Sequence, residues 1–189
     1  PRARREAPGP AAVARHPNPY PLRPGPRYAG GMGDYALVLA RVADAPRLAA
    51  MSERLIESGL RPSWPPSRVA WHIRDPDSVV LTARTGDDIA GFAIMRYGDD
   101  TAHLNLLAVA EEHRRRGIAR RLLGWLEETA ITAGTFLIEL ELRETNREAY
   151  AFYAALGYRQ TGLIAGYYQG IEHAICMARA LHAVPDVKG

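Results

Sequence analysis

The chain of 189 residues is 47% apolar and 24% charged, which is the composition of a globular protein with room for one domain and a tail. Its net charge of +3 divides unevenly, because residues 1–33 carry +5 and residues 34–189 carry −2. A basic nucleic-acid-binding domain is therefore not favoured, and the single cysteine, Cys176, excludes an internal disulfide framework and a multi-cysteine metal site.

Residues 1–33 are rich in proline, glycine and arginine, with eight of the 14 prolines and five of the 17 glycines. This composition predicts a flexible, non-catalytic extension, with a docking arm for an acidic partner as the alternative. No run approaches the ~18 apolar residues of a membrane span, and no apolar segment of signal-peptide length follows the first arginines. We expect a cytoplasmic protein with one folded domain over residues 34–183 and a tail at 184–189.

The first elements of the domain alternate between strand and helix. Residues 35–42 predict a strand, and Asp44 is placed to cap a helix that runs to about Ser58. Ser67 is placed to cap a second, short helix that ends before Asp75-Pro76.

The rest of the domain changes its hydrophobic period several times. Three β-rich runs at 78–85, 89–97 and 102–109 predict an antiparallel meander. Helical stripes follow at 117–133 and 146–156, on either side of an alternating strand at 136–143, and the runs 158–168 and 171–181 predict a closing hairpin. Strand–helix–strand units of this kind predict an α/β (α+β) fold with a partly parallel sheet and helices packed on its faces.

The most informative stretch is the loop between the strand at 104–109 and the helix that begins at Gly117. The first turn of a helix has free N–H groups and a partial positive charge, and glycine lets an anion approach closely. Five guanidinium groups surround this point, which predicts a diphosphate site: Arg114, Arg115, Arg116, Arg120 and Arg121. The single glycine fits neither a dinucleotide fingerprint nor a P-loop.

Two motifs resemble a known family. Arg114-x-x-Gly117-x-Ala119 resembles the (Gln/Arg)-x-x-Gly-x-(Gly/Ala) motif of the GNAT superfamily of acetyl-CoA-dependent N-acetyltransferases. Residues 140–143, Asn146 and residues 153–158 are similar to the second motif of that family. The resemblance covers residues 34–181 in element order and is closest to RimI-type ribosomal-protein alanine N-acetyltransferases.

The resemblance implies a mixed, mostly antiparallel twisted sheet of about seven strands and a defined set of acetyl-CoA contacts. The main chain at Leu107 and Val109 would pair with the pantetheine arm, and the loop amides and arginines would hold the pyrophosphate. Asn146 would touch the arm, or cap the following helix, or do both. The implied cofactor-binding residues are Leu107, Ala108, Val109, Arg114, Arg115, Arg116, Gly117, Ile118, Ala119, Arg120 and Asn146.

The same resemblance implies two catalytic residues. Glu141 would be the general base, acting directly or through water, and Tyr153 the general acid for the departing thiolate. A strand N–H near Val109 would donate to the oxyanion. The structural alternatives are a solvated strand face for Glu141 and helix packing against Tyr150 for Tyr153.

The acceptor is implied less closely. Tyr167 and Tyr168 resemble a tyrosine pair that lines the acceptor site, whereas the connection at 169–173 is shorter than in RimI-type enzymes. The acceptor is thus a protein N-terminus or a small-molecule amine. Four histidines lack metal-ligand spacing and are expected in the core or on the surface, and no metal is expected: His72, His103, His113 and His173. Cys176 is expected to be a small buried hydrophobe.

These observations predict an acetyl-CoA-dependent N-acetyltransferase that transfers the acetyl group directly in a ternary complex. The alternative is a non-catalytic acyl-CoA-binding or regulatory module that keeps the loop. No membrane or nucleic-acid partner is expected, and the oligomeric state, a homodimer included, stays open.

Overall fold

The computed structural model describes residues 35–181, so the extension expected at residues 1–33 and the tail at 184–189 lie outside the described residues. Within that range no helix is long and apolar enough to cross a membrane. The elements follow in the order β1 (Ala36–Leu39), η1 (Val42–Asp44), α1 (Ala45–Leu55), α2 (Pro66–Arg74), β2 (Ser78–Thr85), β3 (Asp88–Tyr97), β4 (Thr101–Val109), η2 (Glu111–His113), α3 (Ile118–Ala133), β5 (Leu137–Arg143), α4 (Arg147–Ala155), β6 (Arg159–Tyr168) and β7 (Glu172–Ala180).

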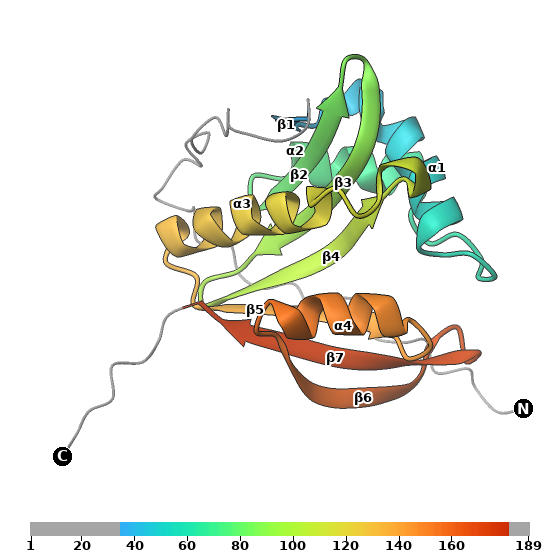
Figure 1. The fold of residues 1–189 in the computed structure, drawn as a ribbon, viewed down its shortest axis with the longest axis vertical. Coiled ribbons are helices and arrows are strands. Elements are labelled where there is room, and N and C mark those ends of the chain that lie inside the picture. The colour runs from blue at the N-terminus through green and yellow to red at the C-terminus, as the bar shows by residue number, and fades with distance from the viewer. Residues whose placement is uncertain (1–34, 182–189) are drawn as a thin grey trace, which may run out of the picture.

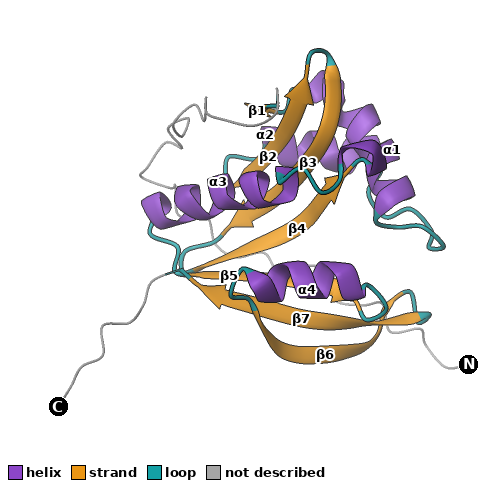
Figure 2. Ribbon diagram, viewed as in Figure 1, coloured by secondary structure: helices purple, strands orange, loops and turns teal. Residues whose placement is uncertain are grey.

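The strands form one seven-stranded sheet in the order β1-β2-β3-β4-β5-β7-β6 (Figure 2). Every neighbouring pair is antiparallel except β4 and β5, which are parallel. A parallel pair needs a crossover, and α3 provides it between β4 and β5. The expected mixed, mostly antiparallel sheet with helices on both faces is confirmed.

The first strand and its following helix differ from expectation. β1 ends at Leu39. Asp44 lies at the N-cap position of α1, but its carboxylate accepts from the main-chain N–H of Arg41 at 2.7 Å and pairs with Arg84 at 2.6 Å. The expected N-cap position of Asp44 is therefore confirmed, but its side chain does not cap the helix, because Arg84 of β2 and the N–H of Arg41 engage the carboxylate. α1 ends at Leu55 rather than near Ser58.

The second helix starts two residues earlier than it would with Ser67 as its N-cap. α2 begins at Pro66 with Pro65 at its N-cap position, so Ser67 lies inside the first turn and does not cap it. Proline is suited to this place because the first helical N–H groups have no intrahelical partner.

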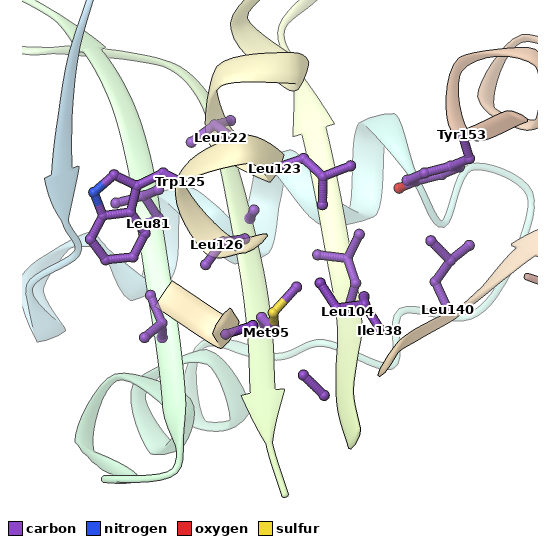
Figure 3. Close-up of a cluster of buried hydrophobic side chains, with 14 of the residues drawn as sticks. Leu81, Met95, Leu104, Leu122, Leu123, Trp125, Leu126, Ile138, Leu140 and Tyr153 are labelled. Carbon is purple, nitrogen blue, oxygen red and sulfur yellow. The ribbon is translucent and has the colours of Figure 1, made fainter. Parts of the chain in front are cut away.

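Two apolar clusters hold the helices on opposite faces of the sheet. α1 and α2 pack with Phe92, Ile94 and Leu106 on one face. α3 and α4 lie on the other face, in front in Figure 1. Figure 3 shows the buried leucine stripe of α3 against Leu81, Met95 and Leu104, where each fully buried leucine contributes about 1.5–3 kcal/mol.

The sheet opens between its two halves. β4 pairs with β5 only over Thr101–His103, although both strands continue, to Val109 and to Arg143. Figure 1 shows the two strands diverging from this short contact. A bulge where Ile94 pairs with Leu106 and Met95 with Leu104 places Asn105 as the extra residue of β4 at the start of the divergence.

Candidate active site

A cleft of about 750 Å³ lies between the diverging strands. Its walls are β4 and the start of α3 on one side, and β5 with α4 on the other. It gathers most of the residues that the sequence singled out, namely Leu107, Ala108, Val109, Arg114, Arg115, Gly117, Ile118, Ala119, Arg120, Glu141, Asn146, Tyr153 and Tyr168.

The β4 wall presents main-chain groups that have no strand partner. The N–H of Ala110 donates to the carbonyl of Ala90 at 2.8 Å, so this position faces β3. Because successive residues of a strand direct their main-chain groups to alternate edges, Ala108 also faces β3, whereas Leu107 and Val109 face the cleft. Among the described residues β5 pairs with β4 no further than His103, so these two residues present an open strand edge to the cleft.

Gly91 on β3 is a residue that sequence reasoning missed. A Cβ built there would lie 2.9 Å from the carbonyl oxygen of Ala108 and 3.2 Å from a side-chain carbon of Ile118. The missing side chain therefore lets the start of α3 pack closely on β3 and β4. An isolated glycine inside a β-rich run was the available signal, since it often marks such a close approach.

The turn into α3 presents main-chain amides that could bind an anion. Arg115 and Gly117 have positive φ values of 61° and 74°, and no side chain caps the helix. The first intrahelical bond runs from the N–H of Arg121 to the carbonyl of Gly117, at 3.1 Å, which leaves the N–H groups of residues 118–120 without an intrahelical acceptor. The first turn has no acidic residue, so its partial positive charge is not offset there.

The arginines of this loop divide into two groups. Arg114, Arg115 and Arg120 line the cleft. Arg116 lies outside the lining and donates to the hydroxyl of Tyr35 at 3.2 Å, and Arg121 donates to the carbonyl of Tyr35 at 3.0 Å. The second group thus fastens the loop to the start of the described chain, whereas the first lines the cleft, with Arg114 also 4.0 Å from the carboxylate of Glu111.

Asn146 and Tyr153 come from α4 and the turn before it. The side-chain oxygen of Asn146 accepts from the N–H of Ala149 at 3.0 Å, so the residue caps α4, and it also lines the cleft. Tyr153 is 8% exposed and packs edge-on against Phe152 and Tyr158. Burial, with nearby Tyr168, raises the pKa of the Tyr153 hydroxyl above its ordinary value, so the group stays protonated at neutral pH.

The Tyr153 hydroxyl makes no hydrogen bond to another described residue. Within residues 35–181 every fully buried side-chain oxygen or nitrogen has a hydrogen-bond partner. Because the Tyr153 oxygen has no such partner, it is not one of the fully buried atoms. Since Tyr153 lines the cleft, the hydroxyl is the part of the ring that a bound molecule can reach.

Glu141 on β5 lines the cleft, and its carboxylate is in hydrogen-bond contact with His103 of β4. Nε2 of His103 lies 2.7 Å from Oε2 of Glu141. His103 was expected to be an ordinary core or surface residue, and its contact with Glu141 was missed because the parallel pairing that joins β4 to β5 is not visible in either strand alone. The hydrogen bond to Glu141 is the main cause that raises the pKa of His103, against the opposing effect of burial.

The two tyrosines of β6 lie on different sides of the cleft boundary. Tyr168 lines the cleft, whereas Tyr167 lies outside the lining and is 49% exposed. Burial raises the pKa of both hydroxyls, and the charge of Glu141 raises both further. Both tyrosines are therefore close enough to Glu141 to be affected by its charge.

A side-chain clasp joins two loops beside this end of the site. Gln169 in the β6–β7 turn donates through Nε2 to the carbonyl of Arg61 at 2.7 Å and accepts from the N–H of Arg61 at 3.0 Å. Arg143 adds a second link, donating to the carbonyl of Ser58 at 2.7 Å and to Glu172 at 2.6 Å. The loop between α1 and α2 is thus held to the β6–β7 hairpin.

The remaining histidines and the cysteine have no shared site. Within residues 35–181 no cluster of three or more His, Cys, Asp and Glu side chains could hold a metal ion. Cys176 is half-buried rather than enclosed in the core, and lies opposite Glu141 in the β5–β7 pairing. Its expected place as a buried hydrophobe is therefore wrong, because β6 and β7 carry α4 on one face only.

Comparisons with known proteins agree with this geometry. A family model described as "Acetyltransferase (GNAT) family" matches residues 48–158, more than half of the chain. The chain is 40% identical over 98 residues to a [ribosomal protein bS18]-alanine N-acetyltransferase of Salmonella typhimurium, which covers 50% of this chain and 66% of that protein. It therefore spans just under two thirds of that curated relative. It is 30% identical over 131 residues to the N-alpha-acetyltransferase RimI of Mycobacterium tuberculosis, which covers 67% of this chain and 80% of that protein.

Solved structures share the fold. The ribosomal-protein-S18-alanine N-acetyltransferase of Escherichia coli matches with a TM-score of 0.70 at 25% identity, covering 81% of this chain and 97% of that one. Arabidopsis thaliana NAA60 in complex with acetyl-CoA matches with a TM-score of 0.68 at 16% identity, covering 77% of this chain and 98% of that one.

Proposed function

The chain belongs to the acetyltransferase (GNAT) family, and from this premise we propose that it transfers the acetyl group of acetyl-CoA directly to an amine in a ternary complex. One observation carries the proposal. A single cleft joins an open strand edge, an uncapped helix N-terminus with three arginines, a carboxylate and a buried phenol. Each of these groups answers a separate need of acetyl transfer from a thioester.

The β4 edge and the α3 turn fit a coenzyme A derivative. The edge groups of Leu107 and Val109 match the amides of a pantetheine arm, which can pair with them as an added strand does. The amides of residues 118–120 match a diphosphate, and the arginines of the cleft neutralise its charge. A Cβ built on Gly117 would meet nothing within 4 Å, so the protein leaves this place open beside the amides. The bound molecule would supply an acetyl thioester.

Glu141 and Tyr153 divide the proton transfers between them. Glu141 takes a proton from the acceptor ammonium, because only the neutral amine has a lone pair with which to form the new C–N bond. A strand N–H near Val109 donates to the oxygen that becomes negative. Tyr153 gives its proton to the sulfur as the C–S bond breaks, and burial, which raises the pKa of its hydroxyl, keeps that proton on the phenol until then. The phenolate then takes up the second proton, which the attacking nitrogen loses as it becomes an amide.

A protein N-terminus is the acceptor that best fits the relatives. The Salmonella and Escherichia coli relatives carry the name of ribosomal-protein alanine N-acetyltransferases. The clasp between Gln169 and Arg61 directly follows Tyr167 and Tyr168 in the chain, and the charge of Glu141 acts on both tyrosines. A small-molecule amine is the second acceptor class, since the short β6–β7 connection differs from the RimI pattern.

The binding test is thermal unfolding with and without acetyl-CoA. At about 100 times the dissociation constant, linkage adds about 2.7 kcal/mol of stability. For a domain of this size the melting temperature should rise by about 5–10 °C. S-acetylpantetheine, which lacks the diphosphate, should raise it much less. No rise at millimolar acetyl-CoA would refute the proposal.

The turnover test measures thiol release with two matched peptides. Both have the same sequence with an N-terminal alanine and one internal lysine. In the first the N-terminus is free and the lysine is acetylated, and in the second the N-terminus is formylated and the lysine is free. Release with the first alone supports a protein N-terminus, and release with neither peptide but with a small amine supports the second class. Strong binding without release for any amine would overturn the catalytic proposal in favour of a regulatory module.

A further inference from the structure

His103 contacts Glu141 from the side that faces away from the cleft. Its Nε2 lies 2.7 Å from Glu141 Oε2, while its own side chain is 40% exposed and is not part of the cleft lining. Glu141 is 20% exposed and does line the cleft. The contact that joins His103 to the cleft is the one to the Glu141 carboxylate, through which an effect of the histidine would be transmitted.

Asn105 fixes which ring nitrogen carries a proton. Its Nδ2 donates to the main-chain carbonyl of His103 at 3.3 Å, and this orients its Oδ1 toward Nδ1 of the ring, 3.3 Å away. An amide oxygen only accepts, so Nδ1 is the nitrogen that carries hydrogen. Nε2 is then left to meet the carboxylate of Glu141, either with a proton between them or with two lone pairs facing each other.

We propose that His103 is a positioning residue for Glu141, and that the two side chains form one base that holds a single proton between Nε2 and Oε2. The inference rests on the proposed function, in which Glu141 removes the proton of the acceptor ammonium. With the shared proton absent, the pair takes a proton from the ammonium and the N–H bond of the amine breaks. The proton then leaves from the exposed ring to solvent, which restores the empty pair for the next turnover.

Other charged groups surround this pair unevenly. Glu139 follows the same face of β5 and also raises the pKa of His103. Arg96 is opposite His103 on β3, but its guanidinium pairs with Asp75 at 3.4 Å. Cys176 on β7 and Tyr167 on β6 lie near Glu141, and its charge raises the pKa of each, so both stay neutral at neutral pH. Arg68 acts on Tyr167 in the opposite direction and lowers the pKa of its hydroxyl. On His103 itself the carboxylates of Glu141 and Glu139 both raise the pKa, which favours retention of the shared proton.

The first experiment does not need activity. NMR titration of the histidine rings in the full chain should place the midpoint of His103 above the ordinary ~6.5, with hydrogen at Nδ1 in the basic form. In Glu141→Gln the midpoint should fall, and in Asn105→Ala it should fall by less and lose the tautomer preference. The ring signals of His173, which is exposed on β7, serve as the internal reference in all three proteins. A His103 midpoint that is equal in wild type and Glu141→Gln would overturn the inference.

The second experiment compares His103→Gln with wild type across pH. The same acceptor is used for both, so dividing the kcat/KM of His103→Gln by that of wild type cancels the titration of the amine itself. A lone carboxylate holds a proton less tightly than histidine does, so the ratio should rise as pH is lowered from about 8 to about 6. At the upper end kcat should be reduced about tenfold with the KM for acetyl-CoA unchanged. His173→Gln, the same substitution outside the cleft, should give a flat ratio.

A double variant separates positioning from folding. Glu141→Gln should lower kcat by about 100-fold or more, and adding His103→Gln should lower it no further, because the histidine acts only through the carboxylate. Additive losses would overturn the inference. Failure of the proposed function looks different: wild type then shows no thiol release and no stabilisation by acetyl-CoA, whatever the ring titrations show.

Discussion

The hydroxyl of Tyr153 offers a clean test of the proton donor, because Tyr153→Phe removes one oxygen and leaves the ring in place. The ring is nine-tenths buried among the side chains of α3, α4 and β5, and phenylalanine keeps those contacts. The hydroxyl has no hydrogen-bond partner among the described residues, so its loss leaves no group unsatisfied. The free energy of unfolding should therefore change by less than about 0.5 kcal/mol.

The catalytic effect should be much larger than this. General-acid assistance contributes about 10²–10⁴-fold, so kcat should fall by at least ~100-fold. Saturation with acetyl-CoA should need the same concentration, since the hydroxyl is not part of the strand edge or the loop. Because burial raises the pKa of Tyr153, wild type should not lose activity through its ionisation below about pH 10.

Tyr158→Phe is the matched control. Tyr158 is also a buried tyrosine, but its hydroxyl donates to Glu127 at 3.1 Å and it is not part of the cleft lining. Its loss should cost about 1 kcal/mol of stability and leave kcat within about twofold. Steady-state thiol release and chemical denaturation of both variants decide the matter. If Tyr153→Phe keeps more than a third of the wild-type kcat, or if the two variants behave alike, the role of the hydroxyl is refuted.

Three further predictions follow from the geometry. Gly117→Ala and Gly134→Ala each place a methyl group at one end of α3, at φ values of 74° and 82° and with nothing within 4 Å. Because an L residue is strained at such φ values, each should lower the free energy of unfolding by about 1–2 kcal/mol. Only Gly117→Ala should also reduce the rise in melting temperature that acetyl-CoA causes. Asn146→Ala should lower the free energy of unfolding by about 1 kcal/mol through loss of the cap, and Asn146→Asp should restore it; equal stability of the two variants would contradict the cap. Burial lowers the pKa of His72 to about 4, so between about pH 6.5 and 4 the folded protein binds fewer protons than the unfolded chain. As the pH falls through that window, the free energy of unfolding should decrease by on the order of 3 kcal/mol. Denaturation curves of His72→Gln should be flatter with pH than those of wild type, and parallel curves would refute the assignment.

The local sequence predicted the elements well where the hydrophobic periodicity agrees with the residues that mark the ends of helices and strands. The apolar stripe of α3, the alternation of β5 and the glycine at the start of α3 each identify an element that the structure contains. Asn146 was also interpretable, because a helix N-cap depends on residues three positions away. Ser67 does not cap α2 because Pro65 occupies the N-cap position. Asp44 has the expected N-cap position but makes no capping bond, because the distant Arg84 engages its carboxylate.

The site was predictable only in so far as it is local. The loop from Arg114 to Arg120 is a continuous stretch, yet the direction of each guanidinium depends on where Tyr35 lies, which is about 80 residues away in sequence. The contact between His103 and Glu141 needs the register of a parallel pair, and neither strand encodes that register by itself.

The unpaired edge of β4 also bears on how the protein keeps apart from its own copies. Exposed strand edges are templates on which other chains add strands, and proteins usually cover or charge them. If acetyl-CoA pairs with this edge as proposed above, it also covers the edge, so preparations stripped of coenzyme A should aggregate sooner than loaded ones.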